Sequence, residues 1–117
     1  MSAAAVAKVN GFKTEILTEV REALTKHRVV VIGMGWNPHV RRARRALDAA
    51  GVPYHYLGYG NYLTGWRDRL AIKLWSGWPT FPQVFVNGEL IGGEDLTKEA
   101  IANGTLASNT LAGAAAT

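Results

Sequence analysis

Three short segments of the sequence carry residue types that can bind or activate a ligand. The first runs from Gly33 to Val40 and leads from an apolar run into a helix. Free backbone N–H groups and the positive end of the helix dipole meet there, which stabilises an anion or a thiolate. The second is Trp78-Pro79-Thr80-Phe81-Pro82, with a candidate cis bond before Pro82, and the third is Gly92-Gly93-Glu94-Asp95. A helix that starts in this third segment offers N–H groups to a carboxylate.

Several other chemistries lack the residues that they need. The 117 residues contain no Cys, which excludes disulfides, zinc–thiolate sites and a nucleophilic thiol supplied by the chain. Gly33 and Gly35 do not make a dinucleotide fingerprint, because the third glycine of that motif is missing. His27, His39 and His55 show no ligand spacing such as i, i+4, so we expect no metal site.

The composition is that of a globular protein with one domain. Apolar residues make up 48% and charged residues 19% of the chain, and the net charge is +4. No apolar run approaches the roughly 20 residues that cross a bilayer, so we expect no membrane contact. The first residues lack the basic-then-apolar order of a secretory signal, which predicts a cytoplasmic protein.

Apolar periodicity predicts the elements that position the first segment. A helix with Phe12, Ile16, Val20 and Leu24 on one face comes first. Residues 29–33 are apolar and β-branched, which is typical of a strand buried on both faces. A second helix then follows, with Asn37 as its N-cap and Pro38 as its first helical residue. Gly51 is the signal that ends it.

The second half of the chain predicts a strand over 54–57, a further helix, a hairpin and a closing helix. The helix has Leu63, Trp66, Leu70 and Leu74 at helical spacing. The hairpin turns at Asn87-Gly88. Asp95 is the expected cap of the closing helix, which stops at Asn103-Gly104.

This order of elements predicts an α/β fold with a mixed four-stranded sheet flanked by helices. We expect the domain to span residues 11–106. Residues 1–10 are predicted to be a flexible N-terminus, and residues 107–117 a disordered, Ala-rich tail, because neither end can bury enough apolar surface.

Taken in order, the three segments resemble the signature segments of the glutaredoxins, over about residues 11–106. Trp78-Pro79-Thr80-Phe81-Pro82-Gln83 is most similar to the monothiol branch of that family. The resemblance implies a thioredoxin-like fold. The chain departs from the family at its reactive position: Asn37 stands where the family has its nucleophilic Cys, and Val40 where dithiol members have the resolving Cys. Met34 replaces a Lys that most members carry.

The departure implies a protein without thiol–disulfide oxidoreductase activity of its own, since exchange needs an attacking thiolate. The iron–sulfur cluster of the family uses the same Cys, so no cluster is expected either. Whether the chain is an enzyme of another kind stays open at this point. The resemblance implies instead a retained groove that binds glutathione or a protein partner.

The expected glutathione contacts are carried over from the family position by position. Arg69 and Lys73 match the positions that meet the glycyl carboxylate, and the Phe81 backbone matches the segment beside the cysteinyl part. Gly93, Glu94 and Asp95 match the turn that holds the γ-glutamyl end. The complete expected set is Asn37, Arg69, Lys73, Thr80, Phe81, Pro82, Gly93, Glu94 and Asp95.

Two alternatives give other roles to the second helix. Asn37 is an ordinary N-cap, or its amide orients the thiol of bound glutathione in a transferase or lyase. Arg41, Arg42, Arg44 and Arg45 form a solvated face or dock an anion or a nucleic acid. No aromatic residue interleaves with these arginines in the sequence, so a stacking surface is not expected, and neither is nucleic acid as a partner.

Overall fold

A computed structural model describes the backbone of residues 3–61 and 63–106, together with the side chains from Glu15 onwards in those ranges. The expected tail, residues 107–117, lies outside the described residues. The elements follow one another in the order α1 (Ala3–Lys26), β1 (Val29–Gly33), α2 (Pro38–Ala49), β2 (His55–Gly58), α3 (Trp66–Ser76), β3 (Gln83–Val86), β4 (Glu89–Gly92) and α4 (Glu94–Ala102).

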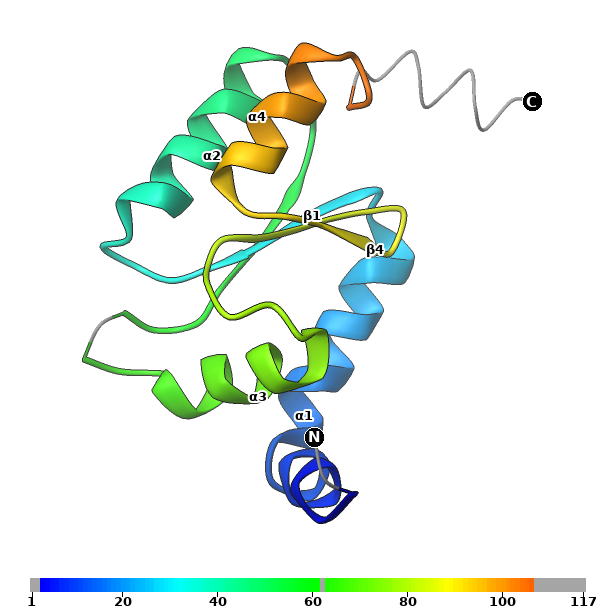
Figure 1. The fold of residues 1–117 in the computed structure, drawn as a ribbon, viewed down its shortest axis with the longest axis vertical. Coiled ribbons are helices and arrows are strands. Elements are labelled where there is room, and N and C mark those ends of the chain that lie inside the picture. The colour runs from blue at the N-terminus through cyan, green and yellow to red at the C-terminus, as the bar shows by residue number, and fades with distance from the viewer. Residues whose placement is uncertain (1–2, 62, 107–117) are drawn as a thin grey trace.

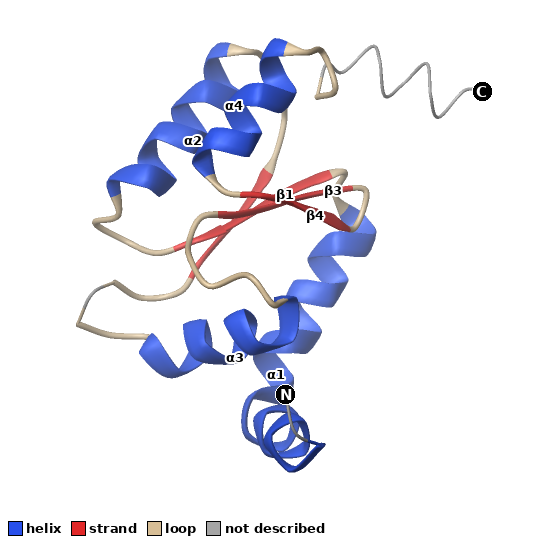
Figure 2. Cartoon of the chain, viewed as in Figure 1, coloured by secondary structure: helices blue, strands red, loops and turns tan. Residues whose placement is uncertain are grey.

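The sheet is mixed, as the sequence predicts. Its strands lie in the order β2-β1-β3-β4; β1 pairs with β2 in parallel and with β3 antiparallel, and β3 pairs antiparallel with β4. Figures 1 and 2 show α2 and α4 together over one face of the sheet and α1 and α3 over the other. The parallel β1–α2–β2 unit sets the start of α2 at the carboxyl end of β1, where ligands bind in open α/β sheets.

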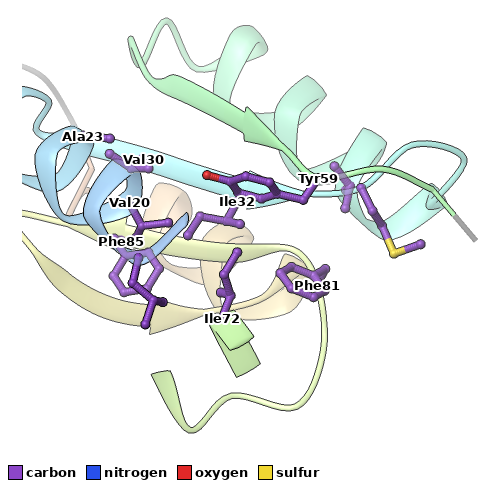
Figure 3. Packing of buried hydrophobic residues seen from close by; sticks show 11 residues of the cluster. Val20, Ala23, Val30, Ile32, Tyr59, Ile72, Phe81 and Phe85 are labelled. Atoms are coloured by element: carbon purple, nitrogen blue, oxygen red, sulfur yellow. The ribbon is translucent and has the colours of Figure 1, made fainter. Parts of the chain in front are cut away.

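Each face of the sheet has its own apolar cluster. Every residue of β1 is buried, and successive side chains point to opposite faces because the strand period is two. Val30 and Ile32 pack with Phe85 and residues of α1 and α3, as Figure 3 shows. Val29 and Val31 pack against the α2–α4 side. The buried β-branched run therefore anchors both helix layers.

Local signals in the sequence predict three junctions correctly. Asn37 caps α2 through its side chain, and Pro38 is the first helical residue. Gly51, with φ of 72°, follows the end of the same helix. Asn87 and Gly88 have φ of 53° and 81°, the two positive values that a tight turn between antiparallel strands requires.

The predicted apolar face of α3 is wrong. Leu63, Trp66 and Leu70 are 78%, 57% and 45% exposed, whereas the buried residues of α3 include Ala71 and Ile72. The helical period holds, but the helix turns its other side to the core, because Ile72 is the residue that packs against α1 and the sheet. Three large apolar side chains therefore lie on the surface.

Two helix starts also differ from the prediction. Gly93, not Asp95, is the N-cap of α4, and no side chain caps this helix. The structure is helical from Ala3, within the segment 1–10 that was expected to be flexible. Alanine has the highest intrinsic helix propensity, so a helix anchored at Leu17 and Val20 extends into the Ala-rich start. Within residues 3–61 and 63–106, no helix combines the length and apolar character that a membrane span requires.

Candidate functional site

A cavity of about 380 Å³ opens between the loop before β3 and the start of α4. We call it the Phe81 groove; the Phe81–Pro82 peptide bond in its wall is cis. Six of the expected glutathione-site residues meet there, although more than ten positions of sequence separate the two segments. The groove is lined by His39, Trp78, Thr80, Phe81, Pro82, Gly93, Glu94, Asp95 and Leu96.

Gly93 lies between the two walls of the groove. A Cβ atom at this position would lie 3.4 Å from the Pro82 carbonyl oxygen and 3.8 Å from Trp78 Nε1. The first helical hydrogen bond of α4 runs from the Thr97 N–H to the Gly93 oxygen at 3.1 Å. The N–H groups of the three residues between them precede the helical ladder, so they are donors at the mouth of the groove.

Glu94 is the charged centre of this region, and its carboxylate already has partners. It accepts hydrogen bonds from Arg42 Nε at 2.8 Å and from Lys98 Nζ at 2.7 Å, and it lies 2.7 Å from His39 Nδ1. The hydrogen bond from Arg42, followed by those from Lys98 and His39, lowers the pKa of Glu94 to about 2. The ionised carboxylate therefore links α4 to α2 and is not an open ligand for a cation.

The partners of Glu94 are not predicted by the sequence features described above. Lys98 follows Glu94 by four residues, a spacing that brings opposite charges together on one helix face and could have been noticed. His39 and Arg42 lie more than fifty residues earlier, and only the packing of α2 beside α4 brings them to the carboxylate.

Asn37 acts as the cap that its residue type predicts. Its Oδ1 accepts the backbone N–H of His39 at 2.8 Å and of Val40 at 3.2 Å. Asn37 is not among the residues that line the Phe81 groove, so the amide is not in position to orient a thiol held there. Val40 and Met34, the other two departures from the family pattern, are buried in the core.

Arg69 and Lys73, expected to share one carboxylate, have different surroundings. Arg69 is 7% exposed, and its Nη1 donates to the carbonyl oxygens of Tyr59 at 2.9 Å and Thr64 at 2.6 Å. Its guanidinium thus holds the loop between β2 and α3. Lys73 Nζ lies 5.7 Å from the centre of the Phe81 ring, at the margin of the Phe81 groove.

Two glycines make the loop under Arg69 sterically demanding. Gly60 and Gly65 have φ of 68° and 76°, in the left-handed region that favours glycine. A Cβ atom on Gly60 would lie 2.2 Å from the Thr64 oxygen, so the loop closes on itself without space for a side chain. The closed loop therefore keeps the side chain of Arg69 buried.

A second cavity, of about 290 Å³, lies between α2 and the edge strand β2. We call it the arginine cavity; Arg41, Arg44, Arg45, Tyr54 and Tyr56 line its polar side. The guanidinium of Arg44 lies over the Tyr56 ring, 3.8 Å from its centre. Parallel pairing of β2 beside β1 brings the tyrosines under α2, a neighbourhood that the sequence spacing does not show.

Among the residues that the structure describes, no group of three or more His, Asp, Glu or Cys could hold a metal ion. The carboxylates of Glu94 and Asp95 line the Phe81 groove beside backbone N–H groups, and Glu94 is already paired with Arg42. Three arginines and two tyrosines line the arginine cavity beside the carboxylate of Asp48. Such donor groups bind anions.

Comparisons with known proteins agree with the fold and with the order of the segments. The glutaredoxin family model matches residues 29–91. "Glutaredoxin-like protein" of Dictyostelium discoideum is 47% identical over 98 residues, covering 84% of this chain and 80% of that protein. Monothiol glutaredoxin-4 of Schizosaccharomyces pombe is 30% identical over 99 residues, covering 83% of this chain and 41% of that protein.

A solved structure shows the same architecture. The crystal structure of the buckwheat glutaredoxin–glutathione complex matches with a TM-score of 0.69 and 25% sequence identity, covering 80% of this chain and 84% of that one. The family model, the relatives and the fold therefore agree, and the chain belongs to the glutaredoxin family, as a member whose 117 residues contain no cysteine.

Proposed function

We propose that this protein binds reduced glutathione in the Phe81 groove and catalyses no thiol–disulfide exchange of its own. The observation that carries the proposal is the convergence of Thr80–Pro82 and Gly93–Asp95 on one open cavity. The buckwheat glutaredoxin, which has a similar fold, was solved in complex with glutathione.

The chemistry of the Phe81 groove suits a small peptide with a carboxylate at each end. The N–H groups at the start of α4 are donors for the γ-glutamyl carboxylate. Lys73, at the margin next to Phe81, is the cation for the glycyl carboxylate. Glutathione lying along the Phe81 backbone spans these two positions. Arg69 takes no part, because its side chain is buried and its Nη1 bonds to the loop carbonyls of Tyr59 and Thr64.

The lack of a thiolate limits what can happen to the bound peptide. Exchange requires a thiolate that attacks a disulfide, and this chain has none. A cysteine ligand for an iron–sulfur cluster is missing for the same reason. We do not propose a transferase, because Asn37 lines the arginine cavity and is not among the residues that line the Phe81 groove. The proposed role is therefore reversible binding.

A protein partner is the second candidate ligand, and the exposed side of α3 favours it. Trp66 and Leu70 of α3, and Leu63 in the loop before it, are large apolar side chains exposed at the surface. If a partner covers this surface, Leu63→Ser combined with Trp66→Ser should prevent its binding, while a substitution in the Phe81 groove should not.

Titration with reduced glutathione, followed through backbone amide shifts by NMR, tests the main proposal. We expect shifts at Phe81, Gly93 and Asp95 with a dissociation constant in the millimolar range or below. Gly93→Ala adds a methyl group between Pro82 and Trp78 at ordinary contact distances, so the fold tolerates it while the groove narrows.

The Gly93→Ala variant should bind glutathione about tenfold more weakly, which corresponds to about 1.4 kcal/mol. Ala102→Ser, at the exposed far end of the same helix, is the matched control and should bind as the parent chain does. The absence of any shift at about 10 mM glutathione contradicts the proposal, and so does equal binding by Gly93→Ala.

A further inference from the structure

The arginine cavity has a charge that the rest of the fold does not neutralise. Arg41, Arg44 and Arg45 line it, and Asp48 is its only carboxylate among the lining residues. Asp48 Oδ2 accepts only a long hydrogen bond, 3.5 Å, from the Tyr54 hydroxyl. Within the described part of the chain, Arg41 and Arg45 are exposed, and their side chains have no hydrogen-bond or ion-pair partner.

The wall of the cavity is organised around Arg44. Its guanidinium stacks on Tyr56, and its Nε donates to the Tyr54 hydroxyl at 3.3 Å. A cation held by stacking and by a hydrogen bond loses little freedom when an anion arrives, which favours binding. Burial raises the pKa of the Tyr56 hydroxyl, so this group remains a protonated donor at neutral pH. Arg44 is thus a preorganised cation beside two exposed cations whose side chains have no partner.

We propose that the arginine cavity binds the phosphate group of a small organic phosphate. A phosphate monoester carries about −1.5 to −2 charges at neutral pH and three acceptor oxygens, which match several guanidinium forks better than a carboxylate does. The volume of about 290 Å³ is near the lower limit of small-molecule pockets, so it holds a phosphate and the group next to it. Trp36, 61% exposed at the rim, offers a flat apolar face to a planar group on the same ligand.

This inference does not depend on the proposed glutathione site. Different residues line the two cavities, which lie on different sides of α2. Arg42 faces Glu94, whereas Arg41 and Arg45 line the arginine cavity. Failure of one site therefore leaves the other untouched.

Calorimetric titrations with inorganic phosphate, ribose 5-phosphate, AMP and adenosine test the inference. We expect the three phosphates to bind and adenosine, which lacks the anion, not to bind. AMP binding more tightly than ribose 5-phosphate identifies a nucleotide as the ligand class, and equal binding identifies a sugar phosphate. Both results support the phosphate site. No heat from any phosphate at about 10 mM overturns it.

Two substitutions on α2 that remove the same charge separate a built site from general attraction. Arg45→Gln should weaken AMP binding about tenfold, as expected when a charge-assisted hydrogen bond is lost. Arg42→Gln, on the same helix but paired with Glu94, should change it by less than twofold. Equal weakening in the two variants contradicts the proposal. An eight-nucleotide RNA that binds over a hundredfold more tightly than AMP also contradicts it, because the surface then serves nucleic acid.

Discussion

The arginines on the two sides of helix α2 differ in whether they have an ionic partner. On the side facing α4, Arg42 is bonded to Glu94, whose carboxylate also holds Lys98. On the side facing β2, Arg41 and Arg45 have no such partner among the described residues. The Phe81 groove therefore presents backbone donors and one cation, Lys73, at its margin, whereas the arginine cavity presents open guanidinium groups.

The difference shows how a family scaffold can be kept while its chemistry changes. Asn37 caps the start of α2 through its side-chain oxygen in a chain that contains no Cys. Arginine and lysine side chains that bond to other groups of the chain stabilise the fold. Basic side chains without such partners are free to bind a ligand. Three predictions test this division.

Arg69 should give the largest effect, because its guanidinium is buried and bonded to two carbonyl groups. Arg69→Met leaves the oxygens of Tyr59 and Thr64 without these donors. We expect the free energy of unfolding, measured by urea denaturation, to fall by about 3 kcal/mol. Arg21→Met, an exposed position on α1, is the control and should change it by about 0.5 kcal/mol or less. An unchanged urea midpoint for Arg69→Met would mean that this arginine is not committed to the loop.

Substitution of Asn37 should lower the free energy of unfolding less than substitution of Arg69. Asn37→Ala removes the acceptor for the N–H groups of His39 and Val40, and we expect a loss of about 1 kcal/mol in unfolding free energy. Asn37→Ser keeps a capping oxygen and should stay within a few tenths of a kcal/mol of the parent. Thermal unfolding of the two variants distinguishes them, and the cap has no energetic role if their midpoints coincide.

The smallest effect is expected at Glu94 and depends on pH. Its pKa is about 2 in the folded chain against an ordinary value of 4.5. A lowered pKa stabilises the fold above pH 4.5, and this contribution disappears as the pH falls toward 2. Solvent screens the partly exposed partners, so Glu94→Gln should cost about 0.5 kcal/mol at pH 7.

The difference between the parent chain and Glu94→Gln should therefore close between pH 4.5 and pH 2. Glu99→Gln, exposed on the same helix, is the control and should track the parent at every pH. A gap between Glu94→Gln and the parent that stays constant down to pH 2 would show that the carboxylate is not held ionised by Arg42 and its neighbours.

Much of the fold could be predicted from the sequence, because local signals and burial pattern agree there. The run Val29–Ile32 can only be a strand buried on both faces, and Asn37-Pro38 and Asn87-Gly88 have one favoured backbone conformation each. The face of α3 could not be predicted, since its sequence offers two apolar sides. Ile72 packs in the core, whereas Leu70 is 45% exposed.

The structure brings some of the predicted glutathione-site residues together, while their role in binding stays a prediction. Thr80, Phe81, Pro82 and the Gly93–Asp95 turn line one groove. The burial of Arg69 and the stacking of Arg44 on Tyr56 could not be predicted from the sequence. Both depend on neighbours that only the tertiary fold brings together, and no sequence spacing indicates these contacts.

The measurement that tests the division between the two sides of α2 most directly is a sequential NMR titration of one ¹⁵N-labelled sample. Reduced glutathione should shift the amides of Phe81, Gly93 and Asp95 while leaving Tyr54 and Arg45 in place. AMP added to the saturated sample should then shift Tyr54 and Arg45 without displacing glutathione. Displacement of glutathione by AMP, or glutathione shifts centred on Arg45, would contradict the account, because both ligands would then share a single anion site.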